Sequence, residues 1–243
     1  MTSALVGVAL SAALAAPAVL EVGRFSAATP GEVPPPGWEP LRFPRIERAT
    51  DYRLQAIDGV VVVHATSRGA ASGWIRKLRI DAREYPLVEW RWKIDGLIEG
   101  SDVRKKSGDD YPARLYVAFE YEPSRASVLE KAKFEAARLY YGEYPPGAAI
   151  NYIWEARAPL GTVVPNPYTA RAMMIVVESG RGRVGTWVTE QRNLLEDFRG
   201  AFGHDPPPIS GVAIMTDTDD TGASASASYG DVVFRRPQTT QEK

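Results

Sequence analysis

The sequence predicts an all-β fold, an antiparallel β-sandwich with two short covering helices. Segments typical of strands recur about every ten residues, and apolar and polar side chains alternate within them. Only two segments show the spacing of a helix. The chain has 243 residues, 29 of them Lys or Arg and 30 Asp or Glu, so its net charge is −1. This length suits a single β domain.

The N-terminus predicts a signal peptide over residues 1–18. Residues 4–20 are small or aliphatic and carry no charge, and Ala16-Pro17-Ala18 has the small-x-small form of a cleavage site. A buried helix and an uncleaved anchor are the alternatives, although the run is short for a membrane span. The chain has no cysteine, which excludes disulfides, thiolate metal sites and cysteine nucleophiles. We therefore expect a periplasmic or secreted protein with no membrane span in its mature chain.

The rest of the chain divides into a lead-in rich in Pro and Gly (19–50), the sandwich domain (51–236) and a polar tail (237–243). Asp58-Gly59 suits the tight turn of a hairpin. The expected strands are 52–57, 60–66, 74–81, 87–94, 114–121, 150–156, 170–178, 185–188, 211–216 and 226–234.

Two segments predict helices laid over a sheet edge. Residues 127–141 begin with Ser127 and Glu130 in capping-box spacing, place four apolar side chains on one stripe and end at Gly142. Residues 190–202 also carry an apolar stripe and end at Gly203, with Thr189 as the expected cap.

Alternation along the strands predicts one polar face. Arg91 and Lys93 lie opposite the apolar positions of their strand, as do Arg114 and Tyr116 of theirs. If the two strands share a sheet, these side chains form a basic strip that suits an anionic ligand. An ordinary solvated face is the competing interpretation. The near-zero net charge argues against a nucleic-acid partner.

Two acidic segments are candidate sites. Asp109 and Asp110 follow a pair of lysines, and they predict either a solvated loop or groups for sugar hydroxyls and acid–base work. Asp217, Asp219 and Thr221 stand at positions 1, 3 and 5 before a glycine, as in the first half of a Ca²⁺ loop. The twelfth position is a serine, so a polar β-turn is the alternative to calcium.

Aromatic residues beside polar ones add further candidates. Trp187, Glu190 and Arg192 meet where a strand is expected to lead into a helix, and Asn151 and Trp154 lie in one strand. Core packing and capping are the plain explanations. A stacking surface for a sugar ring is the functional one.

Several strings resemble a family of secreted bacterial proteins, the domain of unknown function number 3047. The strings are Ala71-Ser-Gly73, Trp90-Arg-Trp-Lys93, Gly108-Asp-Asp-Tyr-Pro-Ala-Arg114, Asn151-Tyr-Ile-Trp154, Glu190-Gln-Arg192, Phe202-Gly203 and Thr216-Asp-Thr-Asp219 with Thr221-Gly222. The resemblance runs from about residue 25 to 234. It implies a sandwich similar to carbohydrate-binding jelly rolls and no established activity.

The leading hypothesis is therefore an exported jelly-roll protein that binds a carbohydrate, with an anionic cell-envelope glycan as one candidate ligand. The ligand-binding candidates are Arg91, Lys93, Asp109, Arg114, Tyr116, Asn151, Trp154, Trp187 and Arg192. A polysaccharide-active enzyme is the alternative, either a glycoside hydrolase using Asp110, Glu190 and Asp217 or a uronate lyase using the basic strip. An envelope structural protein is the third possibility.

Overall fold

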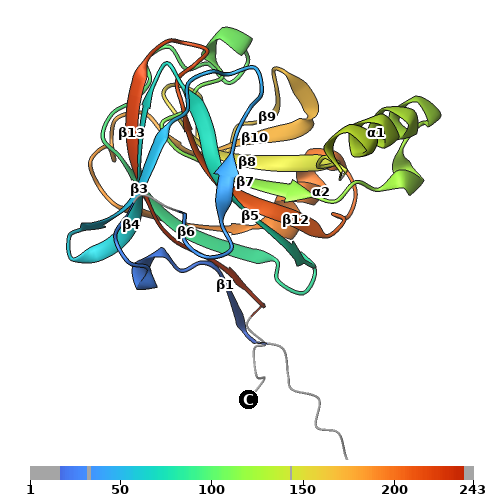
Figure 1. The fold of residues 1–243 in the computed structure, drawn as a ribbon, viewed down its shortest axis with the longest axis horizontal. Helices are drawn as coiled ribbons and strands as arrows, with labels where there is room; N and C mark the ends of the chain where they lie inside the picture. Colours follow the sequence, from blue (N-terminus) through green and yellow to red (C-terminus); the bar gives the residue numbers. More distant parts are fainter. Residues whose placement is uncertain (1–16, 32–33, 143, 238–243) are drawn as a thin grey trace, which may run out of the picture.

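The structure is a computed structural model that describes residues 17–31, 34–142 and 144–237, and two β-sheets face each other in it (Figure 1). Residues 1–16 of the predicted signal peptide, and most of the predicted polar tail, lie outside the described residues. Cleavage after Ala18 therefore stays a prediction. Neither helix of the described residues is long and apolar enough to cross a membrane.

One sheet has six strands, in the order β11-β6-β13-β4-β3, with β1 also paired to β13. All its neighbouring strands are antiparallel. Its strands are β1 (Val19–Gly23), β3 (Asp51–Ile57), β4 (Val60–Arg68), β6 (Leu87–Ile94), β11 (Val188–Asn193) and β13 (Ser224–Arg235).

The other sheet has seven strands, in the order β2-β5-β12-β7-β8-β10-β9. Only β8 and β10 run parallel among the strand pairs of the described residues. Its strands are β2 (Glu39–Leu41), β5 (Ala71–Ile80), β7 (Arg114–Phe119), β8 (Ala148–Glu155), β9 (Val163–Asn166), β10 (Thr169–Ser179) and β12 (Ile209–Asp217). The predicted all-β sandwich with two short helices is confirmed.

Aromatic side chains fill the space between the sheets. Along β6, the apolar positions of the alternating pattern all point inward and are buried. Trp90 lies 5.1 Å from Tyr152 and Trp92 lies 6.2 Å from Trp154, measured between ring centroids. Each pair joins β6 of one sheet to β8 of the other, so the two sheets share one core.

The segment 19–50 is more regular than its composition predicts, because it contains β1 and β2. β1 pairs with the end of β13, and β2 forms the edge of the seven-stranded sheet. Phe25 and Trp38 are buried with ring centroids 5.0 Å apart, so two large apolar side chains hold this segment against the sandwich.

Helix α2 (Leu194–Phe202) begins four residues later than predicted. Residues 188–193 pair with β6 as the strand β11, so hydrogen bonding to a neighbouring strand prevails over their helical spacing. Asn193, rather than Thr189, caps the helix: its side-chain oxygen accepts from the amide of Glu196. Leu194 and Phe198 are buried, so α2 covers one end of the core.

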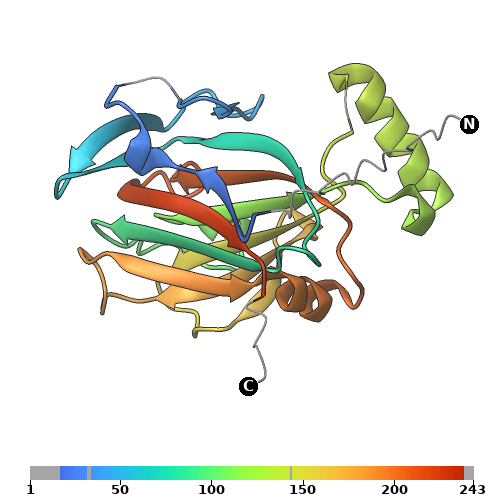
Figure 2. The same ribbon diagram turned by 90° about the horizontal axis from the view of Figure 1, so that it is seen from below.

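Helix α1 (Val128–Tyr141) has the predicted capping box between Ser127 and Glu130, and Gly142 ends it in the left-handed conformation. The prediction that its apolar stripe packs over a sheet edge is wrong, because that stripe is exposed. Val128 is 85% exposed, and the one buried side chain of the helix, among those described, is Phe134. α1 stands out from the sandwich in Figure 2. The described part of the chain also contains three short 3-10 helices: η1 (Phe25–Ala27), η2 (Lys106–Gly108) and η3 (Pro123–Arg125).

Candidate functional site

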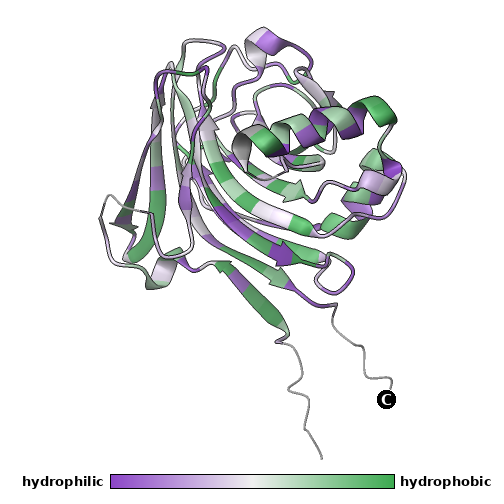
Figure 3. Cartoon of the chain, turned by 45° about the vertical axis from the view of Figure 1, so that its right-hand side comes forward, coloured by the Kyte–Doolittle hydropathy of each residue, from purple (hydrophilic) through white to green (hydrophobic). Residues whose placement is uncertain are grey.

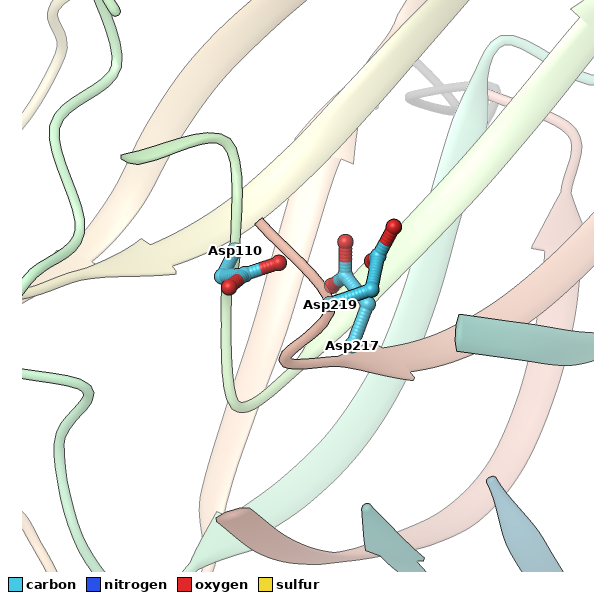
Figure 4. A group of neighbouring side chains, drawn as sticks. All are labelled: Asp110, Asp217 and Asp219. Atoms are coloured by element: carbon cyan, nitrogen blue, oxygen red, sulfur yellow. The ribbon is translucent and has the colours of Figure 1, made fainter. Parts of the chain in front are cut away.

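Three aspartates meet at one end of the sandwich, where the β6–β7 and β12–β13 connections converge. Asp110, Asp217 and Asp219 each offer a carboxylate oxygen, and these oxygens lie within 4.8 Å of one another (Figure 4). Asp110 comes from the β6–β7 connection, whereas Asp217 and Asp219 come from the end of β12 and the turn after it. We call these three residues the aspartate cluster.

Hydrogen bonds fold the turn after β12 against Asp110. Its Oδ1 accepts from the amide of Asp220 at 3.3 Å, and its Oδ2 accepts from both the amide and the hydroxyl of Thr221 at 2.6 Å. The Thr221 hydroxyl is therefore a donor that supports Asp110. This turn does not take the form of an EF-hand loop, because Asp110 of a distant segment completes the cluster.

Arg114, at the start of β7, is buried beside the aspartate cluster. Its Nε donates to Asp217 Oδ1 at 2.8 Å and its Nη2 donates to Asp217 Oδ2. Its Nη1 donates to Asp109 Oδ1 at 3.4 Å, and the ring of Tyr111 lies 4.4 Å from its Cζ. The guanidinium is thus a structural partner of two carboxylates and is not presented to a ligand.

The β9–β10 hairpin closes the other side of this end. Asn166 donates to Asp109 Oδ2 at 2.7 Å, and the Tyr168 hydroxyl donates to Asp220. Tyr168 is 54% exposed, so the outer edge of this region meets solvent.

The electrostatics of this region favour a cation. Five carboxylates lie in this region, those of Asp109, Asp110, Asp217, Asp219 and Asp220, and Arg114 pairs with two of them, Asp109 and Asp217. Burial, with Asp110 and Asp109 nearby, raises the pKa of Asp217 to about 8 although Arg114 opposes this. Burial and Asp110 also raise the pKa of Asp219. Ionisation of the whole cluster is therefore costly without a compensating charge.

A groove of about 640 Å³ runs along the outer face of the seven-stranded sheet, on the side where Arg114 and Asp217 also lie. Tyr116 lines it two residues after Arg114, and Met215 lines it two residues before Asp217. Rings and charged groups both border it. Its lining residues are Glu39, Pro40, Leu41, Arg42, Phe43, Ile75, Lys77, Tyr116, Ala118, Tyr144, Pro145, Pro146, Ser210, Gly211 and Met215.

Two predicted ligand-binding residues of β8 have different surroundings. Asn151 is the register partner of Tyr116 on this outer face, is buried, and its Oδ1 has no hydrogen-bond partner among the described residues. Trp154 is fully buried in the inter-sheet core, where its Nε1 donates to the carbonyl of Gly180 at 3.3 Å. Its predicted role in stacking on a sugar is wrong, because its ring faces the core.

The predicted basic strip is also wrong, because β6 and β7 belong to different sheets. Arg91 and Lys93 lie on the outer face of the six-stranded sheet, 4.8 Å and 5.7 Å from the ring of Trp187. Tyr116 lies on the outer face of the other sheet. The alternation along each strand predicts which of its side chains share a face, but it does not specify which strands are neighbours.

Glu190 is separated from the aspartate cluster. It lies in β11 beside Trp92, whose Nε1 donates to it at 3.3 Å, and beside Glu178 of β10. Burial and Glu178 raise the pKa of Glu190 to about 7. Arg192 of the same strand pairs with Asp197 of α2. Of the three predicted catalytic carboxylates, the structure therefore brings together Asp110 and Asp217 only.

Several groove residues carried no signal in the sequence. Arg42 and Phe43 come from the lead-in, and Tyr144 lies in the connection between α1 and β8. Neither segment has a periodic pattern that would predict its neighbours. The repeated prolines around them are the one visible cue, and they indicate only irregular backbone.

Over residues 36–233 the sequence matches the family described as "Protein of unknown function (DUF3047)". The chain belongs to this family. Membership confirms the resemblance seen in the Asp-Asp-Tyr and Thr-Asp-Thr-Asp strings. No curated protein matches the sequence.

Two solved structures share some of the chain path. The family 11 carbohydrate-binding module of the cellulosomal cellulase Lic26A-Cel5E of Clostridium thermocellum has a TM-score of 0.44 and 8% identity, over 94% of this chain and 100% of that one. The glycoside hydrolase domain of Endo-D from Streptococcus pneumoniae R6 has a TM-score of 0.34 and 9% identity, over 83% of this chain and 22% of that one. At these values neither likeness carries an argument about the ligand.

Proposed function

We propose that this protein binds an oligosaccharide in the groove on the outer face of its seven-stranded sheet. The observation that carries the proposal is the make-up of the groove: the rings of Phe43, Tyr116 and Tyr144 together with the charged side chains Glu39 and Lys77. A sugar ring has apolar C–H faces and a rim of hydroxyl groups. It therefore suits an open groove with aromatic surfaces and a few polar groups.

Tyr116 supplies the central contact in this proposal. Burial raises the pKa of Tyr116 to about 12, so its hydroxyl keeps its proton at neutral pH and can donate to a sugar oxygen. Glu39 and Lys77 pair at 3.1 Å on the groove wall and offer an acceptor and donors for sugar hydroxyls. An anionic preference, predicted from the basic strip, has lost its basis because Arg114 is neutralised by Asp109 and Asp217.

Calorimetric titration against neutral glucans and uronate polymers tests this proposal. We expect Tyr116→Ala to lower the affinity for the bound glycan at least tenfold. Trp187→Ala is the matched control, because it removes an aromatic ring that lies beside the outer face of the six-stranded sheet, and it should leave binding unchanged. Loss of binding in Trp187→Ala, with binding retained in Tyr116→Ala, would place the ligand on the six-stranded sheet instead. Absence of millimolar binding to every glycan would contradict the proposal.

The aspartate cluster is proposed to hold Ca²⁺. Ca²⁺ takes oxygen ligands at about 2.3–2.6 Å, so two of its ligands lie at most about 5 Å apart. The separation within 4.8 Å of the oxygens of Asp110, Asp217 and Asp219 meets this limit. A bound cation would supply the positive charge that compensates these carboxylates. It would also hold together the end of the seven-stranded sheet, which carries the groove.

Calcium binding is tested on protein treated with a chelator. We expect added Ca²⁺ to raise the melting temperature of the natural protein and to have a much smaller effect on Asp219→Asn. Asp95→Asn, which changes an exposed aspartate outside the cluster, is the control. An equal response of the natural protein and Asp219→Asn would contradict a site at the cluster.

Export also stays a proposal, supported by the uncharged run at 4–20 and its small-x-small end. Mass spectrometry of the protein recovered from a periplasmic fraction tests it. A mature chain that starts at Val19 is the expected result, and an intact N-terminus in the cytoplasm would contradict it.

A further inference from the structure

Helix α1 carries an apolar surface on the side that faces away from the sandwich. Val128, Leu129 and Leu139 are 85%, 66% and 81% exposed, and Ala132 and Ala136 between them are exposed as well. At 3.6 residues per turn these five side chains occupy one arc of the helix. We call them the outer arc of α1.

The opposite side of the same helix contacts the sandwich. Phe134 lies about half a turn of rotation from the centre of the outer arc. Its ring stacks on that of Tyr121, with centroids 3.8 Å apart and planes 5° apart, and Arg171 of β10 lies 4.6 Å above it. The helix is therefore fixed by its inner side while the outer arc is left without a protein partner among the described residues.

The charges beside the outer arc have a definite sign. Lys131 and Lys133 flank the arc on its two sides, and neither forms an ion pair within the described part of the chain. The acidic side chains of the helix are already paired: Glu130 with Arg171 at 3.3 Å and Glu135 with Arg138 at 3.0 Å. An apolar arc between two unpaired lysines complements a surface that is apolar within and anionic at its rim.

The position of α1 leaves the outer arc accessible to a large flat partner. The helix projects from the sandwich in Figures 1 and 2, and Figure 3 shows apolar residues along it. Neither sheet would obstruct a flat partner that approaches from that side. A helix that lies in a bilayer interface has this combination of apolar side chains and flanking lysines whose stems reach along the apolar zone.

We propose that α1 docks the protein onto the surface of an anionic lipid bilayer through its outer arc, without spanning it. This surface is separate from the sugar groove, so the two proposals can fail independently. Docking through α1 would place the groove next to a membrane.

Flotation with vesicles tests the proposal on the full chain. We expect binding to vesicles of phosphatidylethanolamine and phosphatidylglycerol, with at least fivefold less protein bound to pure phosphatidylcholine and a decrease as salt is added. Leu129→Glu with Leu139→Glu should lower binding at least tenfold. The control, Leu160→Glu with Val163→Glu, places two charges at exposed apolar residues outside α1 and should bind like the natural protein.

A second variant tests the proposal in case the protein with Leu129→Glu and Leu139→Glu does not fold. Lys131→Ser with Lys133→Ser removes the flanking charges and should lower binding to anionic vesicles severalfold. No binding of the natural protein, or equal binding of all variants, would overturn the proposal. Sedimentation that shows a dimer which the glutamate pair dissociates would overturn it in favour of a second copy as the partner of α1.

Discussion

Arg114 shows how far the surroundings of one residue can depart from its position in a strand pattern. Alternation places Arg114 on the outer face of β7, where a charged side chain is ordinarily solvated. The β6–β7 connection instead covers that face, and Val103 and Tyr111 pack there with Ile153 and Met174. Arg114 is consequently 4% exposed and bound to Asp109 and Asp217.

Removal of this guanidinium should destabilise the protein strongly. We expect Arg114→Met to lower the free energy of unfolding by about 3–5 kcal/mol, because two buried carboxylates lose their counter-ion. Urea denaturation measures the change. Arg181→Ala, which breaks an exposed pair with Glu99, should change it by less than about 0.5 kcal/mol. A loss below about 1 kcal/mol for Arg114→Met would show that water replaces the guanidinium.

Glu190 should make stability fall as the pH rises. Its pKa is raised to about 7 in the folded protein, above the ordinary value of 4.5, so the unfolded chain releases its proton at a lower pH. Its contribution is fully present below pH 4.5 and is lost as the pH rises through about 7. Melting temperatures at pH 5 and pH 8 measure this effect.

The variant Glu190→Gln should show a smaller fall in melting temperature between pH 5 and pH 8 than the natural protein. Glu196→Gln, at an exposed position of α2, should behave like the natural protein. An identical fall in Glu190→Gln would contradict the assignment.

At the scale of elements, the two helices differ in what stabilises them. α2 buries Leu194 and Phe198 in the core, whereas α1 depends on its caps and on Phe134. Short helices are marginal in water without tertiary packing. The capping box of Ser127 and Glu130 should therefore matter more for α1 than such a box does for a buried helix.

Ser127→Ala should loosen α1 without affecting the sheets. Loss of the cap costs about 1 kcal/mol, which corresponds to about fivefold faster amide exchange in the helix. Hydrogen exchange resolved by peptide measures this change. Ser124→Ala, a nearby serine outside the capping box, should leave exchange in α1 unchanged. Faster exchange throughout β7 and β8 would show instead that α1 is part of the cooperative core.

For the whole molecule, the aromatic contacts between β6 and β8 join the two sheets into one cooperative unit. Trp154→Ala should lower the free energy of unfolding by about 3–5 kcal/mol, because it leaves a large cavity against Trp92. Near-UV and far-UV circular dichroism should still report a single transition. Two separate transitions would contradict a shared core and the predicted single domain.

The local features of this protein can be predicted from its amino-acid sequence alone. The periods of its apolar residues specified most strands, and the spacing of Ser127 and Glu130 specified a helix start, because both depend on neighbours within a few residues. The strings around Asp110 and Asp217 also identified the family. These predictions need no knowledge of which elements pack together.

Which of these elements lie side by side depends on tertiary packing. Strand order placed Arg91 and Tyr116 on opposite outer faces, pairing with β6 made a strand of residues 188–193, and converging loops added Asp110 to Asp217 and Asp219. Each outcome depends on contacts between residues far apart in the chain. Alternation predicts on which side of a strand a residue lies, but not which strand lies beside it. The candidate site depends on which strands and connections are neighbours.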